Sequence, residues 1–223
     1  HDDNLARHRV PRHKGQGEDS LMIKNIIFDM GNVLLKFDRN YFLDAVGVRP
    51  EDQRTLMNNV YLSLEWAKMD RGSMTEAEAA ASMCSRLPER LHEQAHLLVD
   101  RWDRPILPVP GMAELVRELK EAGYGVYLLS NASYRQHEYW PRVPGSEYFD
   151  GTLISADVKL VKPCAEIYEL LYSTFGLIPG ECLFIDDSAP NIEGAERTGM
   201  PGIVFHGDAD ELRSEMNAFG VNI

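Results

Sequence analysis

Asp29 directly follows the apolar residues 26–28 and precedes a turn that contains Gly31. Short apolar runs are typical of buried strands, and open α/β sheets collect ligands at the carboxyl ends of their strands. The segment therefore predicts a sheet that presents a carboxylate at one edge. An aspartate that only opens a turn explains this segment equally well when it is taken alone.

Three later segments carry polar residues in a similar setting, and together they favour the first interpretation. Two of them end apolar runs, and the third isolates a lysine between Val161 and Pro163. The polar residues are Ser130 and Asn131, Lys162, and Asp186 and Asp187. If the strands are neighbours in a parallel sheet, their ends bring these side chains into one crevice.

Helical and strand patterns alternate from residue 108 onward, which is typical of a parallel sheet with helices on both faces. Strands are expected at residues 124–129, 152–154, 182–185 and 202–205, with helices between and after them. The predicted fold class is α/β, a doubly wound parallel sheet with an inserted helical domain.

The domain limits follow from where the patterns change. Residues 1–21 show almost no apolar periodicity and are expected to form a flexible N-terminal extension, while residues 22–39 and 105–223 form the core. Residues 40–104 show only helical patterns, including apolar residues at 56, 60 and 64 and a capping-box pair, Thr75 and Glu78. They are predicted to form a helical cap.

Composition excludes several classes of function. The formal net charge of −12, with no basic stripe, argues against a nucleic-acid partner. No run approaches the roughly 18 apolar residues of a membrane span, so a cytoplasmic protein without a membrane partner is expected. The three cysteines are expected to be reduced and mostly part of the core, and Cys164 beside the lysine segment is expected to be buried.

The polar residues predict phosphoryl-transfer chemistry on a small phosphate ester. Asp29 and Asp186 offer the oxygen ligands that Mg²⁺ prefers, and an aspartate can attack phosphorus to form an aspartyl-phosphate. Lys162, Ser130 and Asn131 would neutralise charge on the transferring group. Asp187 is expected to orient its neighbours rather than bind the metal directly.

The same residues resemble the motifs of the haloacid dehalogenase superfamily, from about residue 23 to the C-terminus. The resemblance implies that Asp29 is the nucleophile, that the Gly31 carbonyl joins Asp29 and Asp186 as a Mg²⁺ ligand, and that residues 40–104 are the family's helical cap. The run Phe-Asp-x-Gly-Asn-Val, with Ser-Asn and Trp140-Pro141, is most similar to the α-D-glucose-1-phosphate phosphatase branch. A sugar phosphate is the substrate that this branch implies.

Gly31 departs from most phosphatases of the superfamily, which carry a second aspartate there as general acid and base. Loss of a general acid and base typically lowers the rate by a factor of about 10² to 10⁴. A substrate hydroxyl, a water near Asn32 or a residue of the cap are the candidates for the missing proton donor. In the cap, Glu65, Trp66 and Arg71 are the candidate specificity residues.

Three other functions share part of this pattern of residues. A receiver domain uses similar residues, but it begins with an acidic pair and lacks a helical insertion. A dehalogenase would use Asp29 without metal, which leaves the paired aspartates 186 and 187 without a purpose. A phosphate-binding regulatory protein with weakened catalysis is motivated by Gly31. The charged residues Arg135, His137 and Arg142 are expected on an exposed, solvated helix.

Overall fold

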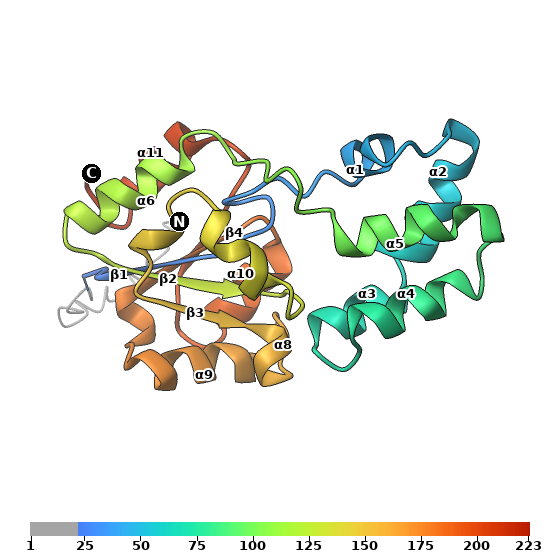
Figure 1. The fold of residues 1–223 in the computed structure, drawn as a ribbon. Coiled ribbons are helices and arrows are strands. Elements are labelled where there is room, and N and C mark those ends of the chain that lie inside the picture. Colours follow the sequence, from blue (N-terminus) through green and yellow to red (C-terminus); the bar gives the residue numbers. More distant parts are fainter. Residues whose placement is uncertain (1–21) are drawn as a thin grey trace, which may run out of the picture.

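Five parallel strands in the order β3-β2-β1-β4-β5 form the sheet of one lobe (Figure 1). The computed structural model describes residues 22–223, and the predicted extension of residues 1–21 lies outside them. The strands are β1 (Asn25–Phe28), β2 (Gly125–Ser130), β3 (Gly151–Ile154), β4 (Cys182–Asp186) and β5 (Gly202–Val204). The predicted α/β class with a doubly wound parallel sheet is confirmed.

Helices cover both faces of this sheet because side chains alternate along each strand. Ile26 and Phe28 of β1 belong to a cluster with apolar residues of α6 and α11, whereas Ile27 packs in a second cluster with residues of α9 and α10. The helices of this lobe are α6 (Met112–Glu121), α7 (Gln136–Tyr139), α8 (Ser155–Val158), α9 (Ala165–Phe175), α10 (Ala189–Glu196) and α11 (Ala209–Asn217).

The strand register determines which residues meet at the edge of the sheet. Phe28 pairs with Leu128 of β2 and with Ile185 of β4. The residues that follow these partners therefore emerge side by side at the carboxyl edge. Asp29 lies in the centre, because β1 is the middle strand.

A second, all-helical lobe lies beyond this edge (Figure 1). Its elements are α1 (Arg39–Ala45), α2 (Pro50–Leu56), a π-helical turn (Met57–Tyr61), α3 (Leu64–Asp70), α4 (Glu76–Cys84), a 3-10 turn (Glu89–Leu91) and α5 (His92–Asp100). It has its own apolar cluster. The predicted capping box of Thr75 and Glu78 begins α4. The limits of residues 40–104 for a cap remain a prediction.

Two expected buried residues, Leu64 in the helical lobe and Cys164 in the sheet lobe, are exposed. Leu64 does not continue the buried face of residues 56 and 60, because Ser63 caps a new helix and leaves Leu64 67% exposed. Cys84 and Cys182 are buried as expected, but Cys164 is exposed. No helix within residues 22–223 is both long and apolar enough to cross a bilayer.

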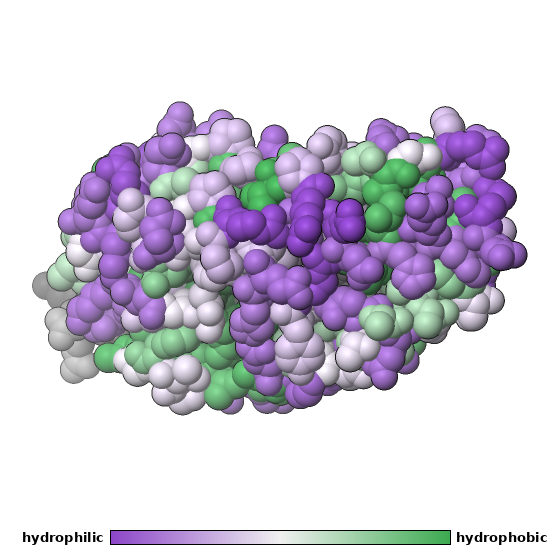
Figure 2. Space-filling model, viewed as in Figure 1, coloured by the Kyte–Doolittle hydropathy of each residue, from purple (hydrophilic) through white to green (hydrophobic). Residues whose placement is uncertain are grey.

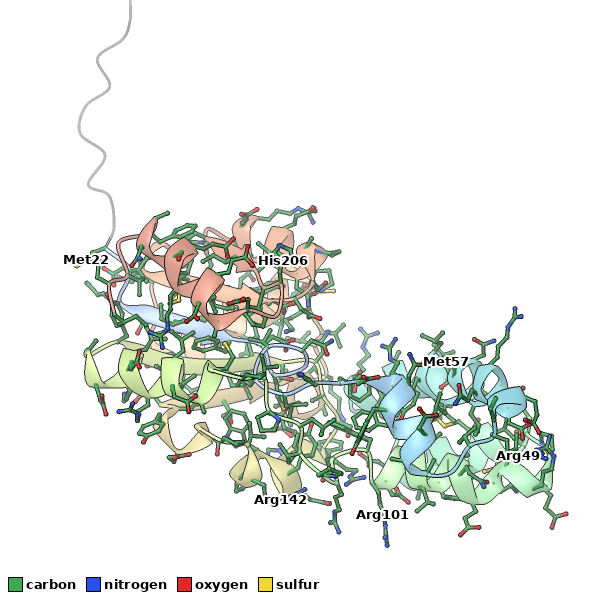
Figure 3. All side chains as sticks on the ribbon, turned by 90° about the horizontal axis from the view of Figure 1, so that it is seen from above. Met22, Arg49, Met57, Arg101, Arg142 and His206 are labelled. Atoms are coloured by element: carbon green, nitrogen blue, oxygen red, sulfur yellow. The ribbon has the colours of Figure 1, made fainter. Side chains whose placement is uncertain are left out.

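Asp103 ties the chain between the lobes to the sheet lobe through two arginines. Its fully buried carboxylate accepts from Arg135 at 2.6 Å and also pairs with Arg142, while Arg135 donates to the Val99 carbonyl at 3.0 Å. Arg142 lies on the side of the sheet lobe that faces the helical lobe (Figure 3). Arg135 is buried, so the expectation of a solvated charge is wrong for it; His137 is exposed and pairs with Asp157.

We expect Asp103→Ala to lower the free energy of unfolding by about 3 kcal/mol, because it leaves the buried Arg135 guanidinium without its counter-charge. Urea unfolding of both proteins measures this difference. Asp100→Ala is the matched control: Asp100 is exposed, and its loss should change stability by less than about 0.5 kcal/mol. Equal effects of the two substitutions would contradict this account of Asp103.

Candidate active site

Asp29 is fixed at the carboxyl end of β1 by the backbone around it. Its amide donates to the Ile185 carbonyl at 2.8 Å, which continues the pairing of β1 with β4 beyond the last strand residue. The chain then turns sharply, and Asn32 adopts a left-handed conformation with φ 58°. The turn leaves the Asp29 carboxylate pointing out of the sheet while only 8% of the residue is exposed.

Lys162 joins the carboxylates at the strand ends. Its ammonium donates to Asp29 Oδ1 at 2.8 Å, to Asp186 Oδ2 at 2.7 Å and to the Leu129 carbonyl at 2.9 Å. An ammonium has three N–H groups, so all of its donors are used. This geometry brings together all four segments that the sequence singled out, because Leu129 belongs to the run that ends at Ser130.

Asn131 holds the backbone of Lys162 rather than projecting freely into the site. Its Oδ1 accepts from the Lys162 amide at 2.9 Å, and its Nδ2 donates to the Lys162 carbonyl at 3.0 Å. The two hydrogen bonds resemble one step of a sheet ladder between segments 31 residues apart. Asn131 thus determines where the lysine enters the site, and it also lines the cavity beside Ser130.

Burial and the neighbouring opposite charges shift the pKa values of Asp29 and Lys162 in opposite directions. Burial raises the pKa of Asp29 above its ordinary value; the Lys162 ammonium opposes this shift and the Asp186 carboxylate adds to it. Burial would lower the pKa of Lys162, but Asp29 and Asp186 outweigh it and hold that pKa above the ordinary value. Lys162 therefore stays charged, and Asp29 is ionised most readily when further positive charge is near.

Asp186 and Asp187 complete an oxygen-rich group. Asp186 accepts from the Ser188 amide at 2.8 Å and from Asn191 at 3.0 and 3.1 Å, and Asp187 accepts from Asn32 at 3.0 Å. Carboxylate oxygens of residues 29, 186 and 187 lie within 4.8 Å of one another. Three carboxylates against one ammonium leave two negative charges uncompensated when all are ionised. The donor set suits a hard divalent cation such as Mg²⁺.

These groups open into a cavity of about 300 Å³ between the two lobes. The face of the molecule shown in Figure 2 is mostly hydrophilic, with strongly hydrophilic residues where the lobes approach each other and smaller apolar patches on either side. Lys162 and Arg39 are the basic residues among the cavity's lining residues, and Trp66, Trp102, Phe37 and Met69 supply its apolar wall. The cavity is thus charged at the sheet edge and aromatic toward the helical lobe.

The three candidate specificity residues lie in different environments. Trp66 lines the cavity, whereas Glu65 and Arg71 do not. Glu65 is buried, accepts from Arg86 at 2.6 and 2.9 Å and from Ser82 at 2.7 Å, and joins α3 to α4. Arg71 follows α3 as an exposed residue.

We expect Glu65→Gln to lower the melting temperature without changing substrate preference. The Arg86 hydrogen bonds, aided by Ser82, lower the pKa of Glu65 to about 2 against burial, so its stabilising effect is complete above the unfolded-state pKa of about 4.3 and is lost as pH falls toward 2. Melting temperatures from pH 7 to pH 2 should converge for the two proteins. Glu169→Gln, at an exposed position, should differ little from wild type at any pH. An altered KM at unchanged stability would contradict this role.

Sequence reasoning missed several residues that complete the site. Asn191 lies inside the recognised acidic segment and holds Asp186, but its contact depends on the first turn of α10. Asp70 and Tyr139 line the cavity from outside the strand ends. Their only sequence signal is position, because Asp70 immediately precedes the candidate Arg71 and Tyr139 follows the Ser130 segment.

The family model of the haloacid dehalogenase-like hydrolases matches residues 23–199. The match covers most of the chain and contains the four segments that meet at the sheet edge. The chain belongs to this family.

Three curated relatives show the range of proteins that share the sequence pattern. Sesquiterpene phosphatase astK of Aspergillus oryzae is 29% identical over 81% of this chain and 88% of its own length. D-ribitol-5-phosphate phosphatase of Bacteroides thetaiotaomicron is 27% identical over 80% of this chain and 90% of its own length. Drimenol cyclase drtB of Aspergillus calidoustus is 25% identical over 89% of this chain, which covers only 37% of that protein.

Solved structures share the fold at lower identity. A haloacid dehalogenase family enzyme of Bacteroides thetaiotaomicron, in complex with magnesium and inorganic phosphate, matches with a TM-score of 0.66 at 24% identity, covering 85% of this chain and 98% of its own. L-2-haloacid dehalogenase from Xanthobacter autotrophicus matches with a TM-score of 0.62 at 18% identity, covering 91% of this chain and 85% of its own. Both phosphate-binding and dehalogenating proteins therefore have this architecture.

Proposed function

We propose that this hydrolase is a Mg²⁺-dependent phosphatase that cleaves small phosphomonoesters through an aspartyl-phosphate on Asp29. The observation that carries the proposal is the buried Lys162 ammonium, which bridges Asp29 and Asp186 at the sheet edge. A dehalogenase that uses Asp29 alone has no need of the excess negative charge of residues 186 and 187. That charge matches a metal-dependent reaction on a phosphate group.

In the proposed reaction an Asp29 carboxylate oxygen attacks phosphorus, and the bond from phosphorus to the alcohol oxygen breaks. Lys162 stabilises the charge on the transferring group, and the hydroxyl of Ser130, which lines the cavity, would donate to a phosphoryl oxygen. Bound Mg²⁺ would be held by Asp29, Asp186 and the Gly31 carbonyl, and would neutralise phosphoryl charge. Water then attacks the aspartyl-phosphate, which releases phosphate and restores Asp29.

The cavity restricts the substrate to small esters. A sugar phosphate is the first class, as the sequence implies, and the Bacteroides relative that acts on ribitol 5-phosphate supports it. The phosphate of an apolar alcohol is the second class, because Trp66, Trp102 and Phe37 line the wall toward which an alcohol group would point. The sesquiterpene phosphatase supports this class. A screen of both classes with and without Mg²⁺ separates them.

We expect Asp29→Asn to lower kcat/KM for any phosphomonoester substrate by at least about 10³-fold, because an amide is a poor nucleophile toward phosphorus. The substitution is nearly isosteric, so the melting temperature should show a folded protein. Mass spectrometry after a rapid acid quench should detect a phosphorylated peptide containing residue 29 in wild type only. Asp150→Asn, at a surface pair with Lys120, is the control. Turnover near the wild-type rate in Asp29→Asn would refute the nucleophile assignment.

Metal dependence gives a second expected outcome. Mg²⁺ should raise the melting temperature of wild type, because a ligand that binds only the folded state stabilises it, and Asp186→Asn should reduce this shift. Chelator in excess should abolish phosphate release, and added Mg²⁺ should restore it. Undiminished hydrolysis in chelator, or cleavage of a 2-haloacid without metal, would favour the dehalogenase alternative. Phosphate binding without turnover would favour the regulatory one.

A further inference from the structure

Asp70 brings a carboxyl group from the helical lobe to the reaction site. It is the last residue of α3 and lines the same cavity as Asp29, Ser130 and Lys162. Within residues 22–223 no hydrogen bond or ion pair engages its side chain, although the residue is half-buried. In contrast, the carboxylates of Asp29, Asp186 and Asp187 each accept a hydrogen bond from a side-chain donor. An unengaged carboxyl group in a catalytic cavity remains free to exchange a proton with a substrate.

The position of Asp70 is set by the sheet lobe rather than by its own helix alone. The Ser155 hydroxyl donates to the Asp70 carbonyl, and the Lys159 ammonium donates to the Gly72 carbonyl. Gly72 has φ +70°, and a Cβ there would lie 2.2 Å from the Ala156 carbonyl oxygen. This close approach requires glycine. The turn after α3 is therefore docked against α8, which directly follows β3.

A second contact holds the other end of this turn. Ser133, from the loop after β2, donates to Glu76 Oε1 at 2.6 Å. The segment of residues 70–76 is thus attached at both ends to the sheet lobe, beside the strand ends that carry the site. These attachments keep the Asp70 carboxyl group on the wall of the cavity when the lobes are together.

The chemistry of the proposed function needs such a group, because Gly31 supplies no side chain. When Asp29 attacks phosphorus, the bonding electron pair leaves with the alcohol oxygen, and an ordinary alkoxide is a poor leaving group without a proton. The water that later attacks the aspartyl-phosphate must lose a proton. One carboxyl group that alternates between its two forms satisfies both requirements.

We propose that Asp70 is the catalytic acid and base of this enzyme. The helical lobe supplies it in place of the aspartate that is missing at position 31. The inference rests on the proposed phosphatase activity. In the first step the Asp70 proton passes to the leaving oxygen as the phosphorus–oxygen bond breaks, giving an alcohol and an Asp70 carboxylate. In the second step that carboxylate takes a proton from the attacking water, and phosphate and protonated Asp70 result.

The surroundings of Asp70 favour the protonated form that the first step needs. Burial raises its pKa to about 7, and the carboxylates of Asp29 and Glu76 contribute in the same direction. The other titratable groups that line the cavity are Lys162, Arg39, Tyr139 and Asp187. A substantial fraction of Asp70 is therefore protonated near neutral pH, unlike an ordinary exposed aspartate.

The test compares two esters in wild type and Asp70→Asn, with Mg²⁺ present. One is an alkyl monophosphate, whose leaving group needs a proton, and the other is 4-nitrophenyl phosphate, whose leaving group does not. The readout is kcat/KM, which covers steps up to departure of the first product and so excludes hydrolysis of the aspartyl-phosphate. We expect a loss of about 10² to 10⁴ for the alkyl ester and less than about tenfold for the aryl ester.

Loss of the base should also appear in the second step. With 4-nitrophenyl phosphate, Asp70→Asn should release a rapid first equivalent of nitrophenol and then turn over slowly, because the aspartyl-phosphate accumulates. Asp157→Asn on α8 is the matched control, because it makes the same chemical change at an exposed aspartate that does not line the cavity. It should leave kcat/KM for both esters near the wild-type values and give no burst.

The outcomes separate this inference from the proposed function. Wild type that hydrolyses neither ester would overturn the phosphatase assignment and the inference with it. Active wild type, with an equal loss on both esters or no loss in folded Asp70→Asn, would overturn the role of Asp70 alone.

Gly31→Asp in the Asp70→Asn background provides a gain of function. A Cβ at Gly31 meets nothing within 4 Å, and Gly31 is not among the residues with positive φ, so the backbone accepts a side chain. The new carboxyl group should recover part of the activity on the alkyl ester and leave the aryl ester nearly unchanged. No recovery, in a double variant that folds and still cleaves the aryl ester, would count against proton donation as the lost function.

Discussion

The buried ammonium of Lys162 is the interaction on which the site depends. A charged lysine loses its hydration when it is buried, and it is stable here because Asp29, Asp186 and the Leu129 carbonyl accept hydrogen bonds from its three N–H groups. The geometry of the strand ends follows from this requirement. Asn131 holds the backbone of the lysine, and Asn191 orients Asp186, so that each charged group has a fixed partner. The same arrangement leaves an excess of negative charge, which repels an anionic ester unless a cation offsets it.

Much of this arrangement could be predicted from sequence because it depends on local patterns. An apolar run followed by a polar residue indicates a strand end, and helix signals such as the Thr75 capping box and Gly176 after α9 are short-range. Parallel pairing then places the polar residues that follow Phe28 and Ile185 at one edge. The register needed no long-range information beyond the assumption that the strands are neighbours.

The long-range contacts of charged side chains could not be predicted, because they depend on tertiary packing. Arg135 immediately precedes α7, a four-residue helix that is too short to show a periodic pattern, and its burial depends on Asp103, 32 residues earlier. Glu65 and its neighbour Trp66 look equally suited to specificity in the sequence. The orientation of α3 turns Trp66 toward the cavity and Glu65 toward Arg86. Successive side chains point about 100° apart around a helix, so the rotation of α3 about its axis decides which of the two faces the cavity. The apolar pattern of this seven-residue helix is too short to predict that rotation.

Gly72 shows how closely the position of Asp70 is tied to the docking of the two lobes. Its missing side chain lets the turn after α3 approach Ala156, and the Ser155 and Lys159 contacts form only at that distance. The proposed nucleophile, Asp29, directly follows β1, and the inferred acid, Asp70, is the last residue of α3 before this turn, so the two meet only when the lobes are docked. With the lobes apart, Asp29 and Lys162 would keep their geometry, because all of their partners lie in the sheet lobe. In the proposed reaction the leaving oxygen would then have no acid in reach, and an ordinary phosphate ester would stay intact until the cavity closed around it.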